Sequence, residues 1–448
     1  MSVPDPTTVP ADADLAAEGG NPVQRTAPVR VAPGFGGVPI RDYVTDGVAA
    51  LLLLLSLGLS WDVVSQATDH VHVILITVLS ILSLSTHYLY RVGTFPPEWS
   101  ARTVTLVRAL LNVPYLVMVL VAVVLDLVAV VGESTSLMPG VGGAAALGLA
   151  GACLAATPRS AETDAALATV LAARLRPVFA GLAGTAVVLQ VLALVAAIVN
   201  DVFSYLSGSL VAALLFVALG VLAIAAWGPF AIARGDDTWR PVIVATGATM
   251  LVWVLLFSRH YVVSTGSATL GFVVLAAAAP LAVAPVAWRH GADRRSYGTS
   301  AAGNALLYLL VIAVQVVATS IALLIDADSL LIPTGTLVTL MILALISGVV
   351  AVIGRNALRG PTTLPVLVTL GVILVVGIVV IVVEGASDSF DVGWTDGLVA
   401  FGLPAAAAWA LAFPARNTTV AAALRSGMAS SVPAPATEPV SPPAAPQE

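Results

Sequence analysis

The chain has 448 residues, of which 59% are hydrophobic and 10% are charged, and its mean hydropathy is +1.00. Ordinary soluble domains contain roughly 25% charged residues, so the polar surface available here is too small to cover a water-soluble globule. The formal net charge is -6, and all 19 basic residues are arginines spread along the chain, which argues against a nucleic-acid-binding patch.

The two ends of the chain differ from the rest in composition. Residues 1–40 carry several acids and prolines and no apolar core, which is the wrong order for a cleaved signal peptide. Residues 414–448 are rich in proline and alanine. Both segments are too poor in large apolar side chains to fold, so we predict two disordered cytoplasmic tails around a membrane domain at 41–413.

Twelve apolar stretches of transmembrane length occupy the membrane domain. An isolated apolar run of roughly 20 residues satisfies its backbone hydrogen bonds in lipid only as a helix, so the predicted fold class is all-α, a polytopic transmembrane helix bundle. The stretches lie near residues 43–64, 71–90, 103–130, 139–157, 178–200, 208–232, 241–258, 268–288, 303–325, 330–353, 363–383 and 395–413.

The arginines alternate with the acids along the chain. Of the 19 arginines, 17 lie in every second connection and in the two tails, whereas the alternate connections hold ten acids and one arginine, Arg259. By the positive-inside rule, this pattern predicts an even number of spans with both termini in the cytoplasm.

The longest inner connection has a helical pattern of its own. Over residues 161–176 its leucines and valines share one face, with acids at the beginning and arginines at the end, which suits the helix dipole. We predict an amphipathic helix on the cytoplasmic interface there.

Ionisable residues inside a span are rare because each costs about 2.5 to 3.5 kcal/mol at the bilayer centre. Arg108 lies well inside the third span, with Asn112 one turn further on and Pro114 just beyond. Asp46, at comparable depth in the first span, is the most economical counter-ion. The group predicts either an anion or proton site, or a structural ion pair between helices, or an arginine that reaches the inner interface.

The second span carries a polar stripe of Thr77, Ser80, Ser83 and His87 at helical spacing. Such a stripe faces protein or water. Hydroxyl hydrogen bonds between helices explain it, and His87 adds a titratable group for a proton pathway.

Two glutamines lie near the middle of the fifth and ninth spans. Gln190 and Gln315 are each eleven residues before an acid, Asp201 and Asp326. We expect the two amides either to join helices or to line a binding site.

The remaining polar features give no catalytic or metal-binding pattern. Glu384, Asp388 and Asp391 match no calcium loop and are interpreted as a solvated acidic connection. The chain has no H-E-x-x-H, G-x-S-x-G or Walker motif and no zinc-spaced Cys and His. We therefore expect no enzyme activity, no cofactor and no metal, and Cys153 is the single cysteine.

Two segments resemble known families. The connection at 289–298, RHGADRRSYG, partly resembles the glycine, Asp-Arg and basic loop of major facilitator transporters. The segments IRDYVTDG at 40–47, LLLLL at 51–55 and WD at 61–62 are similar to uncharacterised multi-spanning membrane proteins of high-GC Gram-positive bacteria, as is the lysine-free composition. The second resemblance implies a lineage and no activity.

The number of spans, the short connections and the intramembrane polar groups favour a secondary transporter or substrate translocator of the cytoplasmic membrane. Its expected partners are membrane lipids and a small-molecule or anionic substrate. The competing hypothesis is a non-catalytic membrane scaffold or sensor in cell-envelope assembly, in which the polar groups only hold helices together.

Overall fold

The computed structural model describes most of the membrane domain. The described residues are 38–62, 65–131, 140–159, 165–202, 208–257, 262–263, 271, 273–284, 294–325, 333–360, 362–386 and 394–412. The predicted tails therefore lie almost entirely outside the described residues, as do all of residues 285–293.

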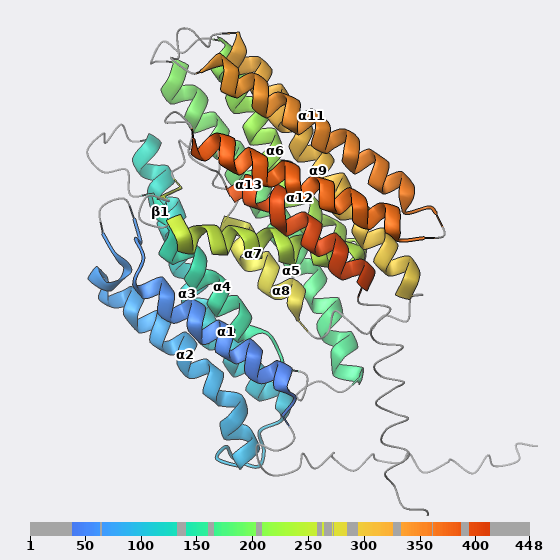
Figure 1. The fold of residues 1–448 in the computed structure, drawn as a ribbon. Coiled ribbons are helices and arrows are strands. Elements are labelled where there is room, and N and C mark those ends of the chain that lie inside the picture. The colour runs from blue at the N-terminus through green and yellow to red at the C-terminus, as the bar shows by residue number, and fades with distance from the viewer. Residues whose placement is uncertain are drawn as a thin grey trace, which may run out of the picture.

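The described chain is almost entirely helical (Figure 1). Each of the twelve predicted apolar stretches coincides with a helix. The helices are α1 (Ile40–Leu57), α2 (Val71–Val92), α3 (Ala101–Val131), α4 (Gly143–Ala156), α5 (Ala165–Val202), α6 (Gly208–Ala233), α7 (Arg240–Phe257), α8 (Val273–Val283), α9 (Arg294–Leu324), α11 (Thr334–Ala357), α12 (Leu364–Gly385) and α13 (Trp394–Gly397), which continues through a π-helix (Leu398–Gly402) to residue 412.

Nine of the described helices are long and apolar enough to cross a membrane, as in a multi-pass membrane protein. The three others are α1, which carries Arg41, Asp42 and Asp46, and the short helices α4 and α8. Twelve crossings and cytoplasmic termini remain predictions.

The outer surface of the bundle carries large apolar side chains, whereas its interior is rich in small and polar side chains. On α2, for example, Leu75 and Leu82 are exposed, whereas Thr77, Ser80 and Ser83 are buried. This arrangement follows from a hydrocarbon solvent, in which helices associate through small residues and hydrogen bonds and not through leucine burial.

The short helices α4 and α8 occupy the centre of the bundle (Figure 1). Every residue of α4 except Cys153 and Ala156 is buried, and so is every residue of α8 except Leu281 and Val283. The two helices pack against each other and against α7. Their 14 and 11 residues span only about 21 and 16 Å at 1.5 Å per residue, against about 30 Å of hydrocarbon.

A pair of two-residue strands lies beside these helices. Strands β1 (Val141–Gly142), directly before α4, and β2 (Val262–Val263) pair antiparallel, with Val141 opposite Val263. Non-helical backbone at membrane depth is tolerated where protein buries it, and β1 is buried.

The predicted surface helix at 161–176 is not a separate element in the described residues. Residues 165–176 form the first turns of α5, which continues through Pro177 to Val202. Its 38 residues extend about 57 Å, so α5 is longer than a bilayer core is thick. A location of these turns on the membrane surface remains a prediction.

Candidate functional site

Four of the six candidate residues come together at one end of the first four helices. Asp46 belongs to α1, His87 to α2, and Arg108 and Asn112 to α3, and all four are buried. They lie in one group of side chains joined by hydrogen bonds and, for His87, by a ring contact with Tyr88, called the α1–α4 polar cluster below. Its members are Asp46, Ser83, Thr86, His87, Tyr88, Arg108, Asn112, Thr157 and Arg159.

Asp46 is the anion at the centre of this cluster. Arg159 donates its Nε–H to Oδ1 of Asp46 at 2.8 Å and adds a second, shorter contact from Nη2, and the Tyr88 hydroxyl donates to Oδ2 at 2.7 Å. The expectation that Asp46 is the counter-ion of Arg108 is therefore wrong. Asp46 pairs with Arg159 because that guanidinium approaches α1 directly from the end of α4.

Arg159 is the cluster residue that sequence reasoning missed, since it lies in a predicted cytoplasmic connection. Its side chain is 1% exposed, and Nη1 donates to the carbonyl of Thr157 at 2.8 Å and of Leu154 at 3.2 Å. Both carbonyls lie at the C-terminal end of α4, where the Leu154 carbonyl also accepts the Thr157 N–H at 3.3 Å and the Thr157 hydroxyl at 2.7 Å. Arg159 thus caps a helix C-terminus, where a cation is favoured, while it neutralises Asp46.

Arg108 reaches the same helix end from α3. Its side chain is 1% exposed, Nε lies 3.4 Å from the Thr86 hydroxyl, and Nη1 lies 3.3 Å from the Thr157 carbonyl. Both distances are at the long end of the range for a hydrogen bond, and both acceptors are neutral. Two guanidinium groups therefore converge on the C-terminus of α4.

Asn112 joins α3 to α2. Its amide nitrogen donates to the Ser83 hydroxyl at 2.8 Å and to the Arg108 carbonyl at 2.9 Å. The Ser83 hydroxyl in turn donates to the Ser80 carbonyl at 2.7 Å. Asn112 therefore lies beside Arg108, as its position one turn later predicts.

The polar stripe of α2 faces protein along its whole length. Thr77, Ser80, Ser83 and His87 are all buried. The His87 ring lies 5.4 Å from the Tyr88 ring in an edge-on arrangement. The stripe is thus a helix-packing surface that ends in the cluster.

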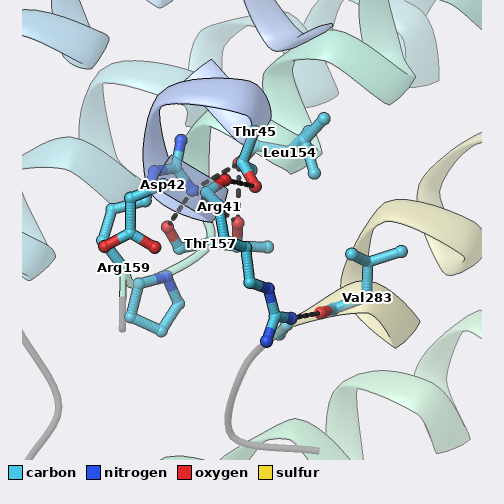
Figure 2. Close-up of a pocket in the computed structure, with 9 residues that line it drawn as sticks. Arg41, Asp42, Thr45, Leu154, Thr157, Arg159 and Val283 are labelled. Atoms are coloured by element: carbon cyan, nitrogen blue, oxygen red, sulfur yellow. Dashed lines mark hydrogen bonds between the residues drawn. The ribbon is translucent and has the colours of Figure 1, made fainter. Parts of the chain in front are cut away.

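A small cavity lies beside Arg159 (Figure 2). Its volume is about 10 Å³, and it is lined by the ends of α1, α4 and α8. This is about the space that one water needs. Arg41 extends across it and donates from Nη2 to the Val283 carbonyl at 2.9 Å, which links α1 to the end of α8 (Figure 2).

The two glutamines lie away from the cluster, on opposite neighbours of α6. Gln190 of α5 faces Gly271, and Gln315 of α9 packs on Gly220 so closely that a Cβ there would overlap its amide. Within the described part of the chain no hydrogen bond joins the two amides, and Oε1 of Gln315 accepts none. The structure therefore does not pair Gln190 with Gln315, nor does it bring them to Arg108.

Metal ligands do not gather anywhere in the described residues. No group of three His, Cys, Asp or Glu side chains could hold a metal ion there. The prediction that Glu384 belongs to a solvated acidic connection is wrong, because Glu384 lies inside α12 and is buried. Asp388 and Asp391 lie outside the described residues.

One protein family matches most of this chain. The model of the domain of unknown function DUF7937 matches residues 42–419. The chain belongs to the DUF7937 family. The match contains the whole α1–α4 polar cluster and extends past the last described helix.

The DUF7937 match supports neither a major facilitator loop nor a bacterial lineage. Of the loop at 289–298, residues 289–293 lie outside the described residues, and Arg294 begins α9. No curated protein and no solved structure matches the chain.

Proposed function

We propose that this DUF7937 protein is a secondary transporter or substrate translocator of the cytoplasmic membrane, with no enzymatic activity. The observation that carries the proposal is the pair of central short helices, α4 and α8, whose residues are almost all buried inside the protein. Transporters place their binding sites at such discontinuous helices, because helix ends supply unpaired backbone groups near the bilayer midplane.

The α1–α4 polar cluster lies at the end of one of these short helices. The Asp46–Arg159 pair joins α1 to α4, and Arg41 joins α1 to α8. In the proposal, these contacts close the cytoplasmic side of the bundle. Separation of α1 from α4 and α8 then opens it.

Arg108 and Asn112 are the proposed contacts for an anionic substrate. Arg108 is buried beside the amide of Asn112, whose nitrogen donates to the Arg108 carbonyl. A guanidinium can bind a substrate carboxylate or phosphate through charge-assisted hydrogen bonds, which are roughly twice as strong as neutral ones. His87, beside Tyr88, remains the proposed proton carrier of this cluster.

The test is a flux assay in proteoliposomes with labelled organic carboxylates, phosphate and sulfate, and neutral solutes as the negative panel. We expect at least one anion to cross, and we expect Arg108→Ala to lower its rate at least 10-fold. Arg108→Lys, which keeps the charge, guards against simple misfolding, and Arg102→Ala, at an exposed position, is the matched control. Equal rates for Arg108→Ala and Arg102→Ala would refute the assigned role.

The alternative is a non-catalytic scaffold or sensor in cell-envelope assembly. It is favoured by the way in which Asp46, Asn112 and Arg159 bond to groups on neighbouring helices inside a closed bundle. Under this alternative, the Arg108 substitutions change the stability of the protein and no solute of the panel crosses the membrane.

A further inference from the structure

Two carboxyl groups share a cavity at the opposite end of the bundle from the α1–α4 polar cluster. Glu384 is near the end of α12, Asp396 is near the beginning of α13, and both side chains line the same cavity. The cavity has a volume of about 40 Å³. It is lined by Leu309, Ile312, Ala313, Val316, Leu340, Ala344, Ser347, Val380, Glu384, Asp396 and Val399.

Glu384 is in an unusual position for an acid. It is 9% exposed, and its Oε2 accepts no hydrogen bond from any described residue. The α9 and α11 walls of the cavity are apolar apart from the Ser347 hydroxyl. An isolated carboxylate in such surroundings is costly unless it is neutralised.

The backbone holds Asp396 at this cavity. The helix widens into a π-helix over Leu398–Gly402, where Val399 lines the cavity, and Pro404 follows without an N–H for the Ala400 carbonyl. Gly377 of α12 fits so closely on Ala400 that a Cβ there would overlap its backbone. Single π-turns inside α-helices are frequent at functional sites.

We propose that Glu384 and Asp396 form a proton-binding site in which the two carboxyl groups share one proton. Two carboxylates in one apolar cavity cannot both ionise without strong repulsion, and a proton between them removes one charge and satisfies the free oxygen. Among the described residues, no other titratable side chain lines the cavity from α9, α11, α12 or the last helix. The nearby α7 contributes Thr249 and Trp253 beside Gly397 and Gly402.

A proton fits this site better than a metal ion does. Calcium takes six to eight oxygen ligands, whereas the cavity walls offer two carboxyl groups and one hydroxyl. A shared proton needs only two oxygens. The site goes beyond the proposed transport activity and does not depend on it, because proton binding is measured on the purified protein without any flux.

The test uses dicyclohexylcarbodiimide, which adds to protonated carboxyl groups in apolar surroundings and leaves a stable acylurea that mass spectrometry locates. On the full-length protein in detergent, we expect labelling at Glu384 that falls at least 10-fold as the pH rises. Glu384→Gln abolishes it, and Asp396→Asn lowers it at least 3-fold at fixed pH. Added Na⁺ leaves the labelling unchanged.

The internal control is Asp126, a fully buried acid of α3 that accepts the Gly140 N–H at 3.0 Å and is expected to stay unlabelled. Absence of label at Glu384, or label equal to that at Asp126, overturns the proposal. Protection by Na⁺ also overturns it, in favour of a metal cation. Should either variant fail to fold, the pH dependence of the unaltered protein decides the matter.

Discussion

Asp46 and Arg159 form a buried ion pair in the α1–α4 polar cluster, and its contribution to stability depends on both partners. Removal of one partner of a buried pair leaves the other charge uncompensated and costs about 3–5 kcal/mol. We expect Asp46→Leu and Arg159→Met each to lower the free energy of unfolding in detergent by that order. The double variant should lose less than the sum by at least about 1 kcal/mol, because an apolar pair leaves no buried charge.

Denaturant unfolding of the unaltered protein, the two single variants and the double variant measures the coupling between Asp46 and Arg159. Arg102→Met, at an exposed position at the beginning of α3, is the control and should stay within about 0.5 kcal/mol. Additive losses at Asp46 and Arg159 would show that the two side chains act independently.

The candidate residues were predictable because charge is rare in an apolar run, but their pairing was not. Asp46, Arg108 and Asn112 stand out in the sequence, and the structure does bring them together. The partner of Asp46 depends on where α4 ends. The helix ends at Ala156, and the apolar stretch predicted at 139–157 gives no sign of what the residues after that end contact. Arg159 therefore looked like one of many cytoplasmic arginines.

At the scale of the helices, close packing of α4 depends on its glycines. A Cβ on Gly151 would lie 2.8 Å from the Leu53 Cγ and 3.1 Å from the Ala49 carbonyl of α1. We expect Gly151→Val to force α1 away from α4 and to cost about 1–3 kcal/mol, as overpacked cores do. Thermal unfolding in detergent measures the loss.

Gly371 of α12 is the matched control for this substitution. It is exposed, and nothing lies within 4 Å of a Cβ built on it. The unfolding temperature of the Gly371→Val variant should therefore lie within a few degrees of that of the unaltered protein. Equal effects at the two positions would mean that helix propensity, and not contact with α1, controls the result.

The existence of the helices follows from composition, whereas their interruptions follow from the fold. Runs of about 20 apolar residues have no other way to satisfy their backbone in lipid, and the structure contains a helix at each run. The sequence does not reveal that α4 and α8 are short, because buried non-helical backbone can be as apolar as a helix. Nor does it place Glu384 in a cavity, since an acid at a helix end is usually solvated.

At the scale of the whole molecule, the α1–α4 polar cluster and the carboxyl pair lie at opposite ends of the bundle. Asp46 lies nearly two turns into α1, and Glu384 lies near the end of α12. The central helices α4 and α8 lie between the two groups of helices that hold these residues (Figure 1). If the arginine distribution sets the orientation, the cluster faces the cytoplasm and the carboxyl pair faces outward. The orientation therefore decides from which side of the membrane each of the two sites is reached.

Thiol labelling of intact cells tests that orientation. The single native cysteine, Cys153, is first replaced by alanine, and one cysteine is then introduced at Thr68 or at Glu98, which are exposed in successive connections. A membrane-impermeant maleimide should label Thr68→Cys at least 10-fold faster than Glu98→Cys, and permeabilised cells should remove the difference. The reverse pattern would place the arginine-rich side outside and the Asp46–Arg159 pair at the outer end. Equal labelling in intact cells would show that α2 does not cross the membrane at all.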